Sequence, residues 1–379
     1  PDFEEKMHKY LKKSGALFND TVDLVVKNNF DSMFDYITTL MRVNPVHVPV
    51  LFRSFYQHVE RYFDSEEAQQ IVSLVAFFLG RTPFDTLAIY TLLSYTEFQH
   101  DGYYNVVGGM YKIIEGLVDE LLKESVQIHY NTEVVDFKAN GKKIKSVIDK
   151  DGKEWSAQTI LINADAAVFR NKVMKHKNYT TEKMDKKSWT MGFLTFYIGL
   201  KCKLPQVDHH NYYLGSNFKE YADKVLTEEN KLEKPYYYVN VVSKYNDDCA
   251  PEGCENLFFV CPVPNLLEKK NWDDRDEIVD SIIEDFSERI GKDISSEIIS
   301  RTIYTPIEWG EQYNLHRGSG LGLSHSFTQI GAMRPANVDE KYENLFYVGA
   351  STVPGAGLPM EIISSKLVFE RIQKYLSNG

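Results

Sequence analysis

The stretch that decides the fold lies near the end of the chain: "FYVGASTVPGAGLPMEIISSKLVFERIQKYL", residues 346–376. An apolar strand pattern is followed by a turn rich in glycine and proline, and then by an uninterrupted helical pattern from Met360. Gly349 and Gly355 leave backbone without a Cβ atom, and Pro359 suits the first turn of a helix. Because a helix N-terminus offers free N–H groups and partial positive charge, this stretch predicts a site for a pyrophosphate or for the anionic edge of a reduced flavin. A turn that only packs tightly is the alternative.

The composition limits what surrounds this site. The chain has 379 residues, too many for one ordinary core, so we expect two or three domains. A hydrophobic fraction of 43% and a charged fraction of 26% are typical of a folded globular protein. The net charge of −11 argues against a nucleic-acid partner, because nothing offsets repulsion by phosphates. No apolar run approaches the ~18 residues that a membrane span needs.

The four cysteines indicate no metal site. Cys202, Cys249, Cys254 and Cys261 form no CxxC pair and have no nearby set of histidines. We therefore predict four buried thiols in a reducing compartment.

Periodicity predicts a mixture of helices and strands. Residues 16–100 have helical spacing of apolar residues, and hairpin turns are expected at Asn140-Gly141 and Asp151-Gly152. A buried strand is predicted at 159–162, ending in Asn163-Ala164-Asp165. Further predicted elements are strands at 192–200, 236–243, 256–262 and 298–306, and an amphipathic helix at 275–290.

Two neighbouring segments carry a family resemblance. "TQIGAMRPAN" (328–337) and "NLFYVGASTVPGAGLPMEIISSK" (344–366) resemble the C-terminal signature of phytoene desaturase-type carotenoid oxidoreductases. Further similarity is found in order along the chain, in "RTPFDTLAIYTLL" (81–93), "GGM" (108–110), "NADAAVFR" (163–170) and "APEGCENLFFVCPVP" (250–264).

The resemblance implies an α/β fold of mixed α+β character, of the FAD-dependent amine-oxidase and phytoene-desaturase type. Its flavin-binding lobe would be discontinuous, formed by 101–165 and 336–379. Residues 166–335, with 1–15, would form a mixed-sheet substrate lobe, and 16–100 a helical cap. Family members open with a βαβ unit bearing G-x-G-x-x-G, and no such motif occurs in the first 150 residues. We therefore expect the N-terminal part of the flavin site to lie outside this sequence, and flavin binding by the chain as shown to be weak or absent.

The resemblance also implies site residues. Those expected to line FAD are Gly349, Ala350, Gly355, Ala356, Gly357 and Pro359, with Asn163, Ala164 and Asp165 at the end of the preceding strand. Val134 resembles the position that contacts the adenine through its backbone, and Gly108-Gly109-Met110 the loop beside the flavin ring. For Val134 and Asp165 a buried strand residue and a helix cap are the alternatives.

Arg42 aligns with an arginine in the helical region of bacterial desaturases and is the expected catalytic residue, the alternative being a solvated helix arginine. Other candidates for polar assistance are Arg81, Arg334, His325 and Glu361.

The implied reaction is desaturation of a carotenoid, in which a hydride leaves an allylic carbon for flavin N5 and the neighbouring carbon loses a proton. The alternatives on the same architecture are a carotenoid isomerase, a retinoid saturase, an amine oxidase or another flavin oxidoreductase. A fifth alternative is a prenyl or lipid escort without redox chemistry. The oligomeric state and the particular carotenoid stay open.

A long polyene has negligible solubility in water, so we expect a cytoplasmic protein attached peripherally to a membrane surface. Residues 41–59 are the expected patch, with Val46, Val48, Val50, Leu51 and Phe52 flanked by Arg42, Arg53, His47 and His58. The alternative is that these side chains pack inside the helical cap.

Overall fold

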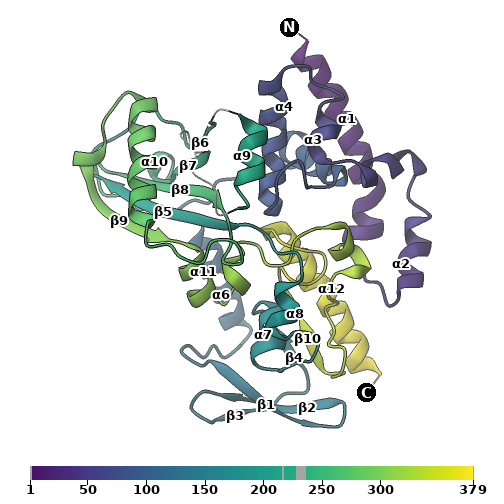
Figure 1. Cartoon of the computed structure of the whole chain (residues 1–379). Coiled ribbons are helices and arrows are strands. Elements are labelled where there is room, and N and C mark those ends of the chain that lie inside the picture. The colour runs from purple at the N-terminus through teal and green to yellow at the C-terminus, as the bar shows by residue number, and fades with distance from the viewer. Residues whose placement is uncertain (1, 216, 228–235, 379) are drawn as a thin grey trace. The chain divides into compact units, whose positions relative to one another are not determined.

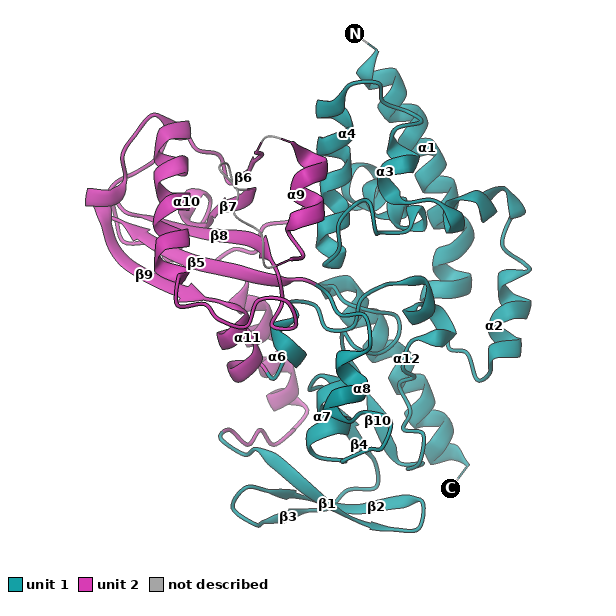
Figure 2. Ribbon diagram, viewed as in Figure 1, with its two compact units in different colours: residues 1–102, 131–190, 314–379 teal, residues 103–130, 191–313 magenta. Residues whose placement is uncertain are grey.

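The computed structural model describes residues 2–215, 217–227 and 236–378 (Figure 1). The chain divides into two compact units (Figure 2). Unit 1 consists of residues 1–102, 131–190 and 314–379, and unit 2 of residues 103–130 and 191–313. Helices and sheets occur in both, which confirms the predicted mixed α and β class.

The first hundred residues of unit 1 are mainly helical, as predicted. Side-chain oxygens of Ser32, Ser54 and Ser65 cap the N-termini of three helices, each accepting a bond from an N–H in the first turn. Tyr10 and Phe55 are fully buried in the core between the helices. The elements are α1 (Phe3–Thr21), η1 (Val22–Val26), α2 (Met33–Leu40), η2 (Pro45–Phe52), α3 (Phe55–Val59), α4 (Glu66–Ser73), η3 (Leu74–Leu79), η4 (Ala88–Thr91), α5 (Leu92–Tyr95) and η5 (Thr96–His100).

The rest of unit 1 contains two small sheets. An antiparallel sheet is formed by β1 (Val134–Asn140), β2 (Lys143–Asp149) and β3 (Glu154–Trp155), with the predicted turns at its two connections. A parallel pair is formed by β4 (Ile160–Ile162) and β10 (Leu345–Tyr347). The helical elements are α7 (Ala166–Lys172), α8 (Thr181–Asp185), η9 (His316–Gly318), η10 (Phe327–Gln329), η11 (Gly331–Met333) and α12 (Leu358–Ser377).

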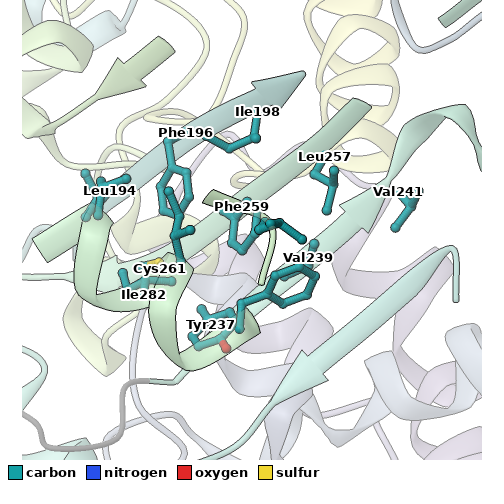
Figure 3. Packing of buried hydrophobic residues seen from close by; sticks show 14 of the residues in the cluster. Leu194, Phe196, Ile198, Tyr237, Val239, Val241, Leu257, Phe259, Cys261 and Ile282 are labelled. Carbon is teal, nitrogen blue, oxygen red and sulfur yellow. The ribbon is translucent and has the colours of Figure 1, made fainter. Parts of the chain in front are cut away.

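Unit 2 is built on an antiparallel sheet in the order β6-β7-β8-β5-β9. Side chains alternate along β8, so that every second residue is buried, and α10 packs on that buried face. Figure 3 shows this core, in which the rings of Phe196 and Phe259 stack with centroids 4.4 Å apart. The strands are β5 (Gly192–Leu200), β6 (His210–Tyr213), β7 (Tyr237–Val241), β8 (Glu255–Val263) and β9 (Ile298–Tyr304); the helical elements are α6 (Tyr111–Lys123), α9 (Phe218–Lys224), η6 (Val242–Lys244), η7 (Asp247–Cys249), α10 (Arg275–Ile290), η8 (Ser295–Glu297) and α11 (Pro306–Gln312).

The compact units differ from the expected lobes. Residues 1–15 belong with 16–100, because α1 runs through both ranges and packs its buried residues into the helical core. Residues 103–130 lie in unit 2, whereas 131–165 lie in unit 1. The pairing of β4 with β10 does join the two ranges predicted to share one lobe. Which unit serves the flavin and which the substrate stays a prediction.

The cysteines differ from expectation. Cys261 is buried, but Cys202, Cys249 and Cys254 are only half-buried, because they lie in or beside the turns that follow or precede strands. All four are free thiols. Among the described residues no group of His, Cys, Asp and Glu could hold a metal ion, and no helix has the length and apolar character needed to cross a bilayer.

Candidate functional site

The candidate site begins at the carboxyl edge of the parallel pair in unit 1. Leu345, Phe346 and Tyr347 pair with Ile160, Leu161 and Ile162, and the N–H of Val348 donates to the carbonyl of Ile162 at 3.0 Å. Both strands therefore end at the same edge, one in Asn163 and the other in Gly349. Ligands in α/β proteins bind outside the carboxyl ends of parallel strands, so this edge is the place to look for one.

The turn between β10 and α12 needs its glycines. Gly349, Gly355 and Gly357 have φ values of 122°, 140° and 122°, which L side chains rarely adopt. A Cβ atom on Gly355 would lie 2.2 Å from Nε2 of His325, so no side chain fits there. A Cβ atom on Gly349 would meet nothing closer than 3.8 Å, so the inner face of that residue is bare.

Arg334 holds this turn in place. Its guanidinium is fully buried and donates to five backbone carbonyls, which are all the N–H groups it has. The acceptors are Thr352 (2.8 Å), Ser324 (3.1 Å), Gln329 (3.0 Å), Leu323 (2.9 Å) and Ala350. Burial lowers the pKa of Arg334 to about 10, so the group stays charged at neutral pH. Arg334 thus joins the turn after β10 to the loop at 323–329.

His325 packs against the same turn. Its ring is only 8% exposed and lies edge-on to Tyr90, with centroids 5.6 Å apart. Burial, and secondarily the charge of Arg334, hold the pKa of His325 well below its usual value, so the imidazole is neutral. Its Nδ1 is buried without a hydrogen-bond partner among the described residues. A buried polar atom without a partner costs about 1–3 kcal/mol.

The structure gives two of the predicted residues clear surroundings. Asp165 caps α7 by accepting from the N–H groups of Ala167 (3.0 Å) and Val168 (2.9 Å), and it also accepts from the hydroxyl of Ser351. Val134 opens β1 and packs against the cluster that includes Tyr347. The helix cap is the alternative named for Asp165, whereas Val134 lies in a strand but is half-buried rather than buried. Cofactor contact by either residue stays a prediction.

Arg42 is exposed in the turn after α2, and among the described residues its guanidinium has no hydrogen bond or ion pair. The structure does not place it with the turn at 349–357, and its catalytic role stays a prediction. Gly108, Gly109 and Met110 lie in unit 2 before α6, where the N–H of Gly108 donates to Oδ1 of Asn246 at 2.9 Å.

The remaining predicted residues lie at the end of β4, in the turn after β10 and at the start of α12. Asn163 and Ala164 are exposed at the end of β4, Ala350 and Ala356 are half-buried, and Pro359 is exposed in the first turn of α12. Sequence reasoning named Arg334, His325 and Glu361 only as polar candidates, and it missed Ser351 and Ser364. The hydroxyl of Ser364 accepts from the N–H of Gly349 at 3.4 Å and donates to the carbonyl of Val353 at 2.8 Å. The signal for Ser364 was its place about two helical turns after Gly357.

The residues present fit a flavin nucleotide. The site offers bare backbone at Gly349, a helix N-terminus without side-chain caps at α12, and polar side chains at Asn163 and Glu361. Free N–H groups at a helix N-terminus suit anionic groups, and bare backbone suits close approach of a chain or ring.

Comparisons with known proteins agree with this geometry. Residues 51–367 match the family model described as flavin containing amine oxidoreductase. The chain is 32% identical over 370 residues to a zeta-carotene-forming phytoene desaturase of Myxococcus xanthus, covering 97% of this chain and 71% of that protein. It is 27% identical over 377 residues to a carotenoid 3,4-desaturase of Haloarcula japonica, covering 98% and 75%.

Solved structures show the same fold. Wild-type putrescine oxidase bound to putrescine matches with a TM-score of 0.59 and 11% identity, covering 100% of this chain and 75% of that one. An oxidoreductase from Methanosarcina mazei matches with a TM-score of 0.57 and 13% identity, covering 89% and 73%. The predicted fold, cofactor and enzyme class are confirmed. The chain therefore belongs to the family of flavin containing amine oxidoreductases, and it is an oxidoreductase with FAD as its cofactor.

Proposed function

We propose that this chain carries out FAD-dependent desaturation of a carotenoid. The observation that carries the proposal is the glycine turn between β10 and α12, which Arg334 holds through hydrogen bonds to backbone carbonyls. Over 97% of its length, this chain is 32% identical to a phytoene desaturase. When bound, FAD supplies the acceptor for the hydride that leaves an allylic carbon.

The chain's own residues hold the cofactor and shape the turn around it. The bare backbone of Gly349 and the N-terminus of α12 would contact FAD, while Arg334 keeps the turn rigid through its five carbonyl bonds. His325 fills the space behind Gly355 and, being neutral, brings no charge to an apolar substrate.

A product analysis tests the proposal and separates the alternatives. The purified protein is incubated with FAD and phytoene in liposomes, and extracted carotenoids are analysed by chromatography with absorbance and mass detection. A desaturase product lacks two hydrogen atoms per step and absorbs at longer wavelength. An isomerase product keeps its mass, and a saturase product gains two hydrogen atoms. Removing FAD should abolish the product and adding it back should restore it; no mass change with any carotenoid offered would refute desaturation.

We further propose attachment to a membrane surface through α2 and η2. Phe34, Met41 and Phe52 are 76%, 79% and 76% exposed. Met33, Ile37, Leu40, Val46 and Val48 are further exposed apolar residues of the same region. Burying about 200 Å² of such surface would contribute on the order of 5 kcal/mol.

The structure divides the patch predicted at 41–59. Val46, Val48 and Phe52 are exposed, whereas Val50 is buried and Leu51 is half-buried. The basic flanks are weaker than expected. His58 is buried and His47 is 2.8 Å from a carboxylate oxygen of Asp20, because both histidines face the helical core rather than solvent. Exposed α2 residues extend the patch toward the N-terminus.

An apolar pocket adjoins this region. It has a volume of about 430 Å³, and Phe52, Leu51, Phe84, Leu87 and Phe327 provide its apolar lining. A polyene leaving the bilayer near Phe52 would meet this pocket first, since apolar ligands bind in concave apolar sites.

Sedimentation with liposomes tests the attachment. The variant Phe34→Asp/Met41→Asp should bind liposomes at least tenfold more weakly than the wild type, because both side chains would leave the apolar phase. Ile299→Asp, at a residue of unit 2 that is 58% exposed, is the matched control and should bind as the wild type does. Equal binding by all three folded proteins would rule out this surface.

A further inference from the structure

The carboxyl group of Glu361 is unusual among the acidic side chains of this protein. Glu361 lies in the first turn of α12, where its N–H donates to the carbonyl of Gly357 at 2.9 Å. Its side chain is half-buried, yet among the described residues it has neither a hydrogen bond nor an ion pair. Burial raises its pKa to about 7, against the opposing charge of Arg334. Every other described carboxyl group with a shifted pKa has it lowered by partners.

Other carboxylates of unit 1 have hydrogen-bond donors for their oxygen atoms. Asp165 holds two amides of α7 and the hydroxyl of Ser351. Asp339 accepts from the hydroxyl of Tyr347 at 2.8 Å and from two backbone amides. Glu361 has lost part of its water without gaining such partners, which is unfavourable unless something else supplies a donor.

The geometry shows where that donor would stand. A carboxylate oxygen of Glu361 lies 3.8 Å from the position that a Cβ atom of Gly349 would occupy, and Oδ1 of Asn163 lies 3.9 Å from the same point. Two oxygen acceptors, one from α12 and one from the end of β4, therefore flank a patch of bare backbone. Ala350, the next residue along the chain, brings no polar side chain to it.

The chemistry of these acceptors selects one part of a flavin nucleotide. A carboxylate repels a phosphate group, and it accepts hydrogen bonds from hydroxyls. Bare backbone beside it suits a flexible chain that bears several hydroxyls. We propose that Glu361, with Asn163, binds the hydroxyl groups of the flavin's ribityl chain. The proposal rests on the flavin cofactor and not on the carotenoid substrate of the proposed function.

Flavin analogues test this directly. Dissociation constants of the full chain are measured by fluorescence quenching for FAD, for riboflavin, and for lumiflavin, which has a methyl group in place of the ribityl chain. Because a hydrogen bond to a charged group contributes about 1.5–3 kcal/mol, Glu361→Leu should weaken FAD and riboflavin binding about 10- to 100-fold. Glu361→Gln keeps one acceptor and should lie between the leucine variant and the wild type.

Lumiflavin is the internal control. Its affinity should be the same for the wild type and both variants, whereas a misfolded variant would lose all three ligands. Glu370→Gln, on the same helix and 3.6 Å from Lys366, should change nothing. Unchanged riboflavin affinity in Glu361→Leu would overturn the proposal. An equal, partial weakening of lumiflavin binding in a variant that keeps the circular dichroism of the wild type would also overturn it, because it would place Glu361 at the ring. The test compares each variant with the wild type, so weak flavin binding by the wild type, as expected from the sequence, leaves the comparison intact, and none of these outcomes bears on the carotenoid.

Discussion

Replacing Arg334 should be among the most damaging single changes in unit 1. Arg334 satisfies five buried carbonyls with its five N–H groups, and Arg334→Met removes all of them. At the low end of about 1 kcal/mol for each buried acceptor left without a donor, the loss is about 5 kcal/mol. That equals the whole stability of a marginal domain, so we expect little folded flavoprotein.

Arg334→Lys tests the same reasoning with a smaller loss of hydrogen-bond donors. A lysine ammonium has three donors, so at least two of the five carbonyls lose their partner even though the charge is kept. Arg334→Lys should therefore cost about 2 kcal/mol or more on the same scale. If charge alone mattered, the lysine variant would instead be close to the wild type.

The measurement is urea unfolding followed by circular dichroism, with the flavin content read from visible absorbance. Arg42→Met is the matched control, because the guanidinium of Arg42 is exposed and has no partner among the described residues. Its free energy of unfolding should stay within about 0.5 kcal/mol of the wild type. A loss of unfolding free energy below about 1 kcal/mol for Arg334→Met, or equal losses for the two methionine variants, would refute the proposed role of Arg334 in holding the turn.

Gly355→Ala should lose flavin and stability, because its Cβ atom would overlap Nε2 of His325. Gly141→Ala is the control: it lies at a hairpin turn with open space and carries only a positive-φ penalty of about 1–2 kcal/mol. Adding His325→Ala to Gly355→Ala should recover part of the loss in urea unfolding, and no recovery would show that the overlap is not the cause. His58 makes stability depend on pH: burial lowers its pKa from 6.5 to about 4, so the unfolded chain binds the proton more tightly. Its contribution is complete above pH 6.5 and is lost as pH falls towards 4, which amounts to about 2.5 kcal/mol at pH 4.5. The wild type should lose that much more than His58→Leu between pH 7 and 4.5, and parallel losses would contradict it.

Local chemistry in the sequence predicted much of the fold. Glycine is the residue that most readily adopts positive φ, so a run of glycines followed by proline and a helical pattern indicated a strand, a turn and a helix at 346–376. The structure has β10, the turn and α12 there. Alternation along β5 and β8 and the Asn140-Gly141 turn were also readable, because strand faces and tight turns depend on neighbouring residues. The order of motifs along the chain indicated the family.

The site itself depended on contacts between distant segments. Nothing in the sequence near Arg334 tells which carbonyls it meets, and nothing near Glu361 tells that its carboxyl group faces bare backbone at Gly349. The extent of the lobes was equally hidden, since α1 joins the helical core through Tyr10 and residues 103–130 pack with unit 2. The sequence by itself determined backbone conformations, because steric limits act within a few residues. Only the tertiary structure decided which polar groups are buried and with which partners, because burial and pairing arise when segments far apart in the chain meet.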